Sequence, residues 1–87
     1  MARIYLPRSL VALIPALPGR VDVEAGSVLE AIDRMEARWP GLRYRVCDAG
    51  PVIREHINVF VDGEMATLET ELRPASEVRI ITAVSGG

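Results

Sequence analysis

Residues 56–64 read HINVFVDGE and contain the clearest strand signal in the chain. The apolar residues Ile57, Val59 and Val61 alternate with residues that would face the other side of a strand over 56–61. Asp62-Gly63 follows directly, and this dipeptide supplies the positive φ angles that a type I′ hairpin turn requires. We therefore expect a hairpin here, with a short return strand over residues 64–67.

Upstream of this hairpin, the sequence predicts one amphipathic helix over residues 28–39. Ser27 and Glu30 form a capping box, in which each side chain can bond a free backbone N–H at the helix start. Pro40-Gly41 ends the pattern, and a further short helical turn is expected over residues 42–47. The apolar residues at helical spacing, which we interpret as core rather than as part of a cofactor site, are Val28, Ile32, Met35 and Trp39.

Three further segments have the composition of strands. Ile4 and Leu6 alternate with other residues before Pro7, and Val21 and Val23 alternate with acidic residues. The segment EVRIITA, residues 77–83, is apolar and β-branched. The order is therefore β-β-α-β-β-β, and a single helix can cover only one face of a sheet. The predicted fold class is α+β, a mixed sheet of four to five strands covered on one face by one main helix.

The alternation within each strand also assigns its residues to one face of the sheet. The set expected to face the helix is Ile4, Leu6, Val21, Val23, Ile57, Val59, Val61, Val78 and Ile80, with Leu68 and Leu72 filling the core from a loop. The outward set is Tyr5, Asn58, Phe60 and Ile81. An open sheet face that meets only water should be polar, so Tyr5, Phe60 and Ile81 are candidate partner-docking residues. The alternative is that they are scattered surface residues without a function.

Composition and charge exclude several classes of function. The chain has 87 residues, which is the size of one domain, and its formal net charge of −2 argues against nucleic-acid binding. Cys47 is the single cysteine and His56 the single histidine, which excludes a disulfide framework and conventional zinc and iron–sulfur sites. We therefore expect no metal and no cofactor on this chain, and we interpret Cys47 as a packing thiol.

The apolar segment over residues 9–17 needs a separate interpretation. It follows Arg3 and Arg8, as the apolar part of a secretory signal would, but Pro15 interrupts it and no clean cleavage site follows. We interpret it as an apolar connection between the first two strands of a cytoplasmic domain. No apolar run reaches the roughly 18 residues that a membrane helix needs, and we expect no membrane association.

The sequence closes with Val84-Ser85-Gly86-Gly87. We expect residues 1–83 to form a single domain and residues 84–87 to form a flexible tail. Glycine has no Cβ, so Gly86 and Gly87 can lie in a channel that is too narrow for side chains, although a terminal glycine pair can also be chance. Elsewhere the sequence shows no nucleophile with a partner base other than His56 and no phosphate-binding loop.

Several of these features together resemble the MoaD/ThiS family of ubiquitin-like sulfur carriers. They are the order of elements, the helix that ends in Trp39-Pro40-Gly41-Leu42, the segment 56–64 and the ending Ala83-Val84-Ser85-Gly86-Gly87. This family includes the small subunit of molybdopterin synthase and the thiamine sulfur carrier. The resemblance spans essentially the whole chain. It implies a β-grasp fold in which the first and last strands run parallel at the centre of the sheet.

The resemblance implies a carrier protein rather than an enzyme. The carboxylate of Gly87 would be adenylated and then converted to a thiocarboxylate. The ATP would be used by an adenylating partner related to ubiquitin-activating enzymes, with Val84, Ser85 and Gly86 threaded into the nucleotide site of that partner. A sulfur-accepting synthase would be the second partner, and the chain could be the small non-catalytic subunit of such a sulfurtransferase. Molybdopterin, and so the molybdenum cofactor, is the expected product, with cysteine or thiazole synthesis as the alternative.

Two departures from the family pattern leave the pathway open. Many members have Gly-Asp in the turn before the last strand, where this chain has Ala75-Ser76-Glu77, and many have prolines where it has Thr82-Ala83. Two other functions also remain open at this stage. One is a protein modifier joined to target lysines through Gly87, for which the complete absence of lysine would prevent self-conjugation. The other is a plain β-grasp interaction module.

Overall fold

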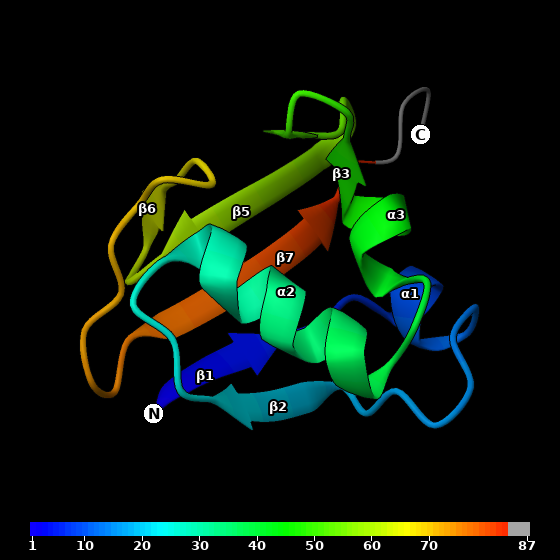
Figure 1. The fold of residues 1–87 in the computed structure, drawn as a ribbon, viewed down its shortest axis with the longest axis horizontal. Coiled ribbons are helices and arrows are strands. Elements are labelled where there is room, and N and C mark those ends of the chain that lie inside the picture. The colour runs from blue at the N-terminus through cyan, green and yellow to red at the C-terminus, as the bar shows by residue number, and fades with distance from the viewer. Residues whose placement is uncertain (84–87) are drawn as a thin grey trace.

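The computed structural model describes residues 1–83 of the chain. Figure 1 shows a mixed sheet with helices in front of one face. The strands and helices are β1 (Ala2–Tyr5), α1 (Arg8–Val11), β2 (Arg20–Val23), α2 (Val28–Arg38), α3 (Leu42–Val46), β3 (Cys47–Asp48), β4 (Val52–Ile53), β5 (Ile57–Val61), β6 (Glu64–Met65) and β7 (Glu77–Thr82).

The main sheet has five strands in the order β2-β1-β7-β5-β6. β1 and β7 pair in parallel, with Ile4 opposite Val78, whereas the other neighbouring strands pair antiparallel. The expectation that the first and last strands run parallel at the centre is therefore confirmed, and the connectivity is that of a β-grasp fold. The end of β7 consequently emerges from the middle of the sheet.

Helix α2 lies across the sheet in Figure 1, and the predicted capping box starts it. The Glu30 backbone N–H donates to Ser27 Oγ at 3.1 Å. The Glu30 carboxylate accepts from the N–H of Gly26, one residue before the expected donor. At the other end the Trp39 indole N–H donates to the Ala16 carbonyl at 3.2 Å, so the end of the helix is tied to the connection between β1 and β2.

The core lies between α2 and the inner face of the sheet, as the alternation predicts. Ile32 and Met35 on the helix and Ile4, Val59 and Val78 on the strands are each no more than 2% exposed. Leu68 and Leu72 are buried from the loop after β6, which confirms their predicted role. One residue of the expected inward set differs: Ile57, the first residue of β5, is only half-buried because it lies at the rim of the sheet.

The connection over residues 9–17 is more structured than the sequence indicated. It contains the short helix α1, and three of its apolar residues are buried in the core, namely Leu10, Ile14 and Leu17. These buried side chains explain why the connection is apolar.

The predicted loop over residues 48–51 is also more ordered than expected. It is the turn of a small second hairpin in which β3 and β4 pair, with Cys47 opposite Ile53. The strand predicted from His56 begins at Ile57, since His56 has a left-handed φ of 72° in the turn before it. The predicted return strand is confined to Glu64–Met65.

The type I′ turn predicted at Asp62-Gly63 is confirmed. Both residues have positive φ, 50° and 88° respectively, as a type I′ turn requires. Ala75, in the turn before β7, also has a positive φ of 69°. This is the turn where many family members carry glycine, and glycine adopts such angles without a steric cost.

No helix within residues 1–83 is both long and apolar enough to span a bilayer.

Candidate functional site

The end of β7 is the point from which the chain leaves the sheet toward residues 84–87. Thr82 Oγ1 lies 3.1 Å from Ser9 Oγ of α1, and the Ala83 N–H donates to the His56 carbonyl at 2.6 Å. Two neighbouring segments therefore hold the chain up to Ala83. The predicted site residues Val84, Ser85, Gly86 and Gly87 lie outside the described residues.

The outer face of the sheet carries a continuous row of side chains across all five strands. Tyr5 on β1 pairs with Arg20 of β2 and Arg79 of β7, and Phe60 on β5 pairs with Arg79 and with Met65 of β6. Directly paired residues point to the same face of a sheet, so these five side chains form one row, here called the outer row.

The predicted docking residues Tyr5, Phe60 and Ile81 lie on this face. Tyr5 and Phe60 are half-buried members of the outer row, and Ile81, 43% exposed, pairs with Asn58 in the adjacent row. The structure therefore brings the three residues to one surface opposite α2. Their role in docking stays a prediction.

Sequence reasoning missed the centre of this surface, which is Arg79. Its guanidinium carbon lies 4.2 Å from the centroid of the Tyr5 ring, an arrangement in which a cation meets the electron-rich face of an aromatic ring. Met65, 70% exposed, extends the row to the sheet edge. The alternation in EVRIITA could have indicated Arg79, since it stands two residues before Ile81.

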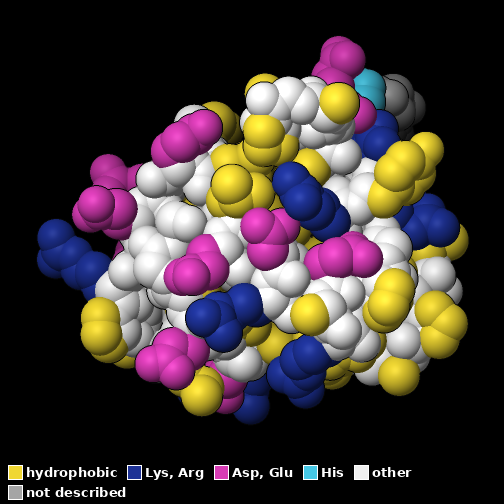
Figure 2. All heavy atoms as spheres, in the orientation of Figure 1, with side chains coloured by type: hydrophobic (Ala, Val, Ile, Leu, Met, Phe, Trp, Pro, Cys, Tyr) yellow, Lys and Arg dark blue, Asp and Glu magenta, His cyan; other side chains and the backbone are white. Residues whose placement is uncertain are grey.

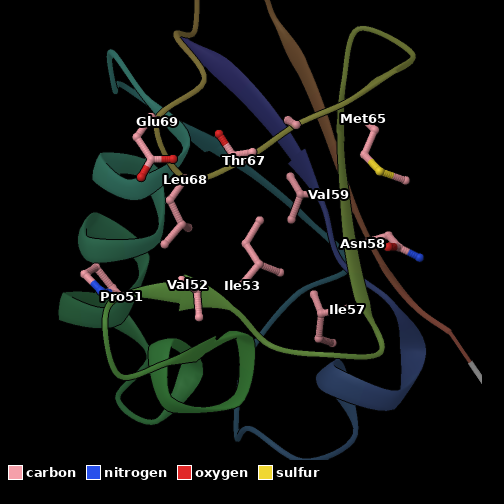
Figure 3. A pocket seen from close by; sticks show the side chains of 11 residues that line it. Pro51, Val52, Ile53, Ile57, Asn58, Val59, Met65, Thr67, Leu68 and Glu69 are labelled. Carbon is pink, nitrogen blue, oxygen red and sulfur yellow. The ribbon is translucent and has the colours of Figure 1, made fainter.

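A hollow of about 340 Å³ opens beside β5 on the helix side of the sheet. Figure 3 shows Ile53, Val59 and Leu68 pointing into it from β4, from β5 and from the loop after β6. Val59 and Leu68 are almost completely buried and form its floor. The hollow is mostly apolar and holds none of the predicted site residues, so it adds no reactive group to the candidate site.

Cys47 occupies a position that fits its interpretation as a packing thiol. Cys47 is 6% exposed, and burial raises the pKa of its thiol, which keeps the sulfur protonated and weakly nucleophilic. This burial confirms the prediction of a packing thiol. His56 is exposed in the turn before β5. Across residues 1–83, no three side chains of the kinds that hold metals come close enough together to do so.

Comparison with known proteins places this geometry in a family. The model of the ThiS family matches residues 16–87, which is most of the chain and includes the closing glycines. The chain belongs to the ThiS family. This confirms the resemblance drawn from the sequence, and the protein is a ubiquitin-like protein of the sulfur carrier and modifier class.

Relatives of this ThiS-family chain agree in sequence and in fold. It is 33% identical over 69 residues to small archaeal modifier protein 1 of Haloferax volcanii, covering 78% of this chain and 79% of that protein. The crystal structure of that modifier matches with a TM-score of 0.76 and 30% identity, over 99% of this chain and 98% of the other.

A second similar structure is a chain in the crystal structure of the Amycolatopsis orientalis BexX/CysO complex. It matches with a TM-score of 0.84 and 26% identity, and all of both chains is covered. The β-grasp fold of this ThiS-family protein is thus confirmed by independent structures.

Proposed function

We propose that this protein is a sulfur carrier whose reactive group is the carboxylate of Gly87. The observation that carries the proposal is the family match over residues 16–87, which extends through the Gly86-Gly87 ending. The anchored end of β7 supports it, because a tail that starts from a fixed point can be directed into a partner. Residues 1–83 act as one recognition domain, and residues 84–87 provide the reach.

The chemistry begins with a poor electrophile, because the charge of a carboxylate is delocalised and its oxide is a bad leaving group. A Gly87 carboxylate oxygen attacks the α-phosphorus of ATP and pyrophosphate leaves, which gives an acyl adenylate. The terminal sulfur of a persulfide on a donor protein then attacks the carbonyl carbon, and AMP leaves. A thiol reduces the resulting acyl disulfide and releases the thiocarboxylate. The adenylating partner supplies the ATP site, and the carrier supplies only the carboxylate.

The outer face is the proposed docking surface for these partners. Tyr5, Phe60 and Ile81 supply apolar and aromatic area, and Arg79 supplies one charge at its centre. Aromatic and arginine side chains are the types that carry most binding energy in protein interfaces. The surface lies on the face of the sheet opposite α2, so a partner can cover it without disturbing the core.

The proposed acceptor is the molybdopterin precursor, with cysteine and thiazole synthesis as the alternatives. The three pathways separate in one experiment. Purified thiocarboxylated carrier is offered to a molybdopterin synthase large subunit, to a cysteine synthase homologue and to a thiazole synthase, and loss of its sulfur is followed by intact mass. We expect release of sulfur to the molybdopterin subunit, and release to another synthase alone would contradict that assignment.

Protein modification is a second candidate, favoured by the 33% identity with small archaeal modifier protein 1. In that case the activated Gly87 carbonyl would be attacked by a lysine amine of a target rather than by sulfur. Both functions share the adenylation step. Higher-mass adducts of the carrier in extracts of its host would indicate modification.

The test of the shared step uses purified carrier, ATP and the adenylating enzyme of the same organism, with ATP–pyrophosphate exchange as the readout. Removing Gly87, or adding one residue after it, should abolish exchange, because the terminal carboxylate then falls short of the α-phosphate or is displaced past it by about 3.5 Å. Both variants should keep a free energy of unfolding within about 0.5 kcal/mol of the parent, as expected for changes outside the core. Undiminished exchange by either variant would contradict the role of Gly87.

A further inference from the structure

The charges of this chain are divided between the two ends of the sheet. At the end from which β7 leaves, residues 6–20 and 38–56 carry six arginines and two carboxylates, a formal charge of +4. Asp33 and Glu36 of α2 contact Arg43 and the start of α3, which reduces the charge at this end to +2. At the opposite end, residues 24–30 and 62–77 carry seven carboxylates and one arginine, a formal charge of −6. A net charge of only −2 therefore conceals a strongly dipolar molecule.

Figure 2 shows part of this division. Most acidic side chains in this view lie on the side of β6, and several arginine and hydrophobic side chains lie over α3 and α1, with further acidic side chains beside α3 and near His56. The described chain ends at Ala83, after β7, at this basic end. A dipole of this kind orients a protein as it approaches a charged partner.

A groove of about 500 Å³ lies at this basic end, between α1 and α3 and beside the last residue of β7. Its lining combines apolar side chains with two arginines, and consists of Ser9, Leu10, Leu13, Tyr44, Arg45, Arg54, Ile57 and Thr82. Two of its large side chains are mostly exposed to solvent, Leu13 at 56% and Tyr44 at 75%. Exposed apolar side chains that share one groove are typical of an interaction site.

The two groove arginines differ in their partners. Arg54 forms an ion pair with Asp48 at 2.6 Å, donates from Nε to the Tyr44 carbonyl and lies over the Tyr44 ring. It is therefore held as part of the groove wall. None of the ion pairs within residues 1–83 involves Arg45, which is exposed. Arg45 thus offers a positive charge beside an apolar surface.

We propose that this groove docks an acidic segment of the adenylating partner, with a carboxylate paired to Arg45 and an apolar side chain seated against Leu13 and Tyr44. The inference rests on the proposed carrier function. Four residues follow Ala83 and span at most about 14 Å, so an enzyme that receives Gly87 in its nucleotide site has the rim of that site near the end of β7 and this groove. Charge complementarity then requires acidic residues on the rim, and the dipole brings the carrier to it tail first.

The test measures ATP–pyrophosphate exchange by the same organism's adenylating enzyme as a function of carrier concentration. Arg45→Glu should raise the KM for the carrier by about tenfold at low salt and leave kcat unchanged, because a rim charge acts mainly on encounter. Leu13→Asp, at an exposed position, should raise KM similarly. Arg73→Glu is the matched control, since it makes the same charge change at the acidic end. Circular dichroism checks that each variant is folded.

The effect of Arg45→Glu should shrink in high salt, where charges are screened over about 3 Å. Equal KM values for the parent, Arg45→Glu and Leu13→Asp would overturn the groove assignment while leaving carrier function intact. An equal loss in Arg73→Glu would also overturn it, because net charge alone would then explain the effect. Absence of exchange by the parent would instead overturn the proposed function, and the inference with it.

The other occupant of the groove to be tested is the acidic end of a second carrier. Sedimentation of the parent protein alone distinguishes the two. A monomer at all concentrations supports docking of the enzyme. Self-association that Arg45→Glu abolishes and Arg73→Glu preserves would assign the groove to carrier–carrier contact and contradict the proposal.

Discussion

Cys47 shows why the sulfur chemistry is assigned to the tail rather than to the single thiol of the chain. Its side chain is buried against the core between α3 and β4, and burial raises the pKa of the thiol. A thiol that is almost completely buried and has a raised pKa forms less thiolate and is poorly placed to attack a persulfide or pass sulfur onward. We therefore expect the Cys47→Ala variant to be loaded with sulfur as fully as the parent, as measured by intact mass. A variant that stays unloaded although it is folded would indicate a relay through Cys47.

The raised pKa of Cys47 also predicts a dependence of stability on pH. Because the thiol pKa is higher in the folded than in the unfolded chain, folding favours the protonated form, and stability falls as the pH rises past about 8.5. Urea unfolding at pH about 7 and about 10 should show this fall, and Cys47→Ala should make it smaller. An identical fall in both proteins would assign the effect to other groups.

Ala75 is held at a backbone angle that favours glycine, with φ of 69°. A non-glycine residue in this left-handed region costs roughly 1–2 kcal/mol, which the greater freedom of glycine in the unfolded chain partly offsets. Ala75→Gly is therefore expected to stabilise the protein by up to about 1 kcal/mol in urea unfolding. Ala83→Gly, near the end of the described chain, is the control and should give no gain. A loss of stability on Ala75→Gly would contradict the strain interpretation.

The packing of α2 against the sheet provides most of the core. Substitutions on the inner face of the sheet and on its outer face should therefore differ in their effect on stability. Ile32, 1% exposed on α2, faces the core from the helix. Ile32→Ala should lower the free energy of unfolding by about 2–4 kcal/mol through loss of burial and cavity formation. Chemical denaturation measures the free energy of unfolding of the variant and of the parent. A loss below about 1 kcal/mol would mean that the helix is less tightly packed than described.

The outer row should show the reverse behaviour. Phe60→Asp places a charge on the outer face, beside Arg79, and leaves the inner face unchanged. Affinity for the adenylating enzyme should fall by about thirtyfold, the loss typical of a central aromatic contact, as measured by calorimetry. The melting temperature should fall by less than that of Ile32→Ala. Unchanged affinity would show that the outer face does not contact this partner.

Regular patterns made most of the fold predictable, and irregular segments did not. The capping box at Ser27, the turn at Asp62-Gly63 and the alternation in β5 and β7 each match what the structure shows, because local sequence alone determines them. The β3–β4 hairpin was missed because its strands have only two residues each, too few to show a period. Helix α1 was missed because its four residues, about one turn, are also too few to show a helical period.

The candidate site was predictable to a similar degree. Alternation alone placed Tyr5, Phe60 and Ile81 on one face, but the central position of Arg79 depends on the register between β1, β7 and β5. The groove between α1 and α3 joins segments more than thirty residues apart, Leu13 and Tyr44 among them. No local pattern reports such a contact, since tertiary packing creates it.

The chain as a whole combines a closed core, an outer sheet face that is proposed to dock partners, and a positively charged end from which β7 leaves. The division of charge is invisible in the overall balance of ten arginines and twelve acidic residues. It becomes visible only when the topology assigns each connection to one end of the sheet. In the proposed function, the outer face recognises the partner and the charged end orients the carrier, so the two roles belong to different parts of the molecule.

In the proposed carrier, sulfur replaces one oxygen of the Gly87 carboxylate. The direct measurement is fragmentation mass spectrometry of the intact protein, purified from its native host without added reductant because a thiol would remove a persulfide from Cys47. We expect a population in which one oxygen atom is replaced by sulfur. Fragments that contain Gly87 should carry the added mass, whereas fragments that contain Cys47 should not. Sulfur found on Cys47 with an unmodified Gly87 would contradict the account.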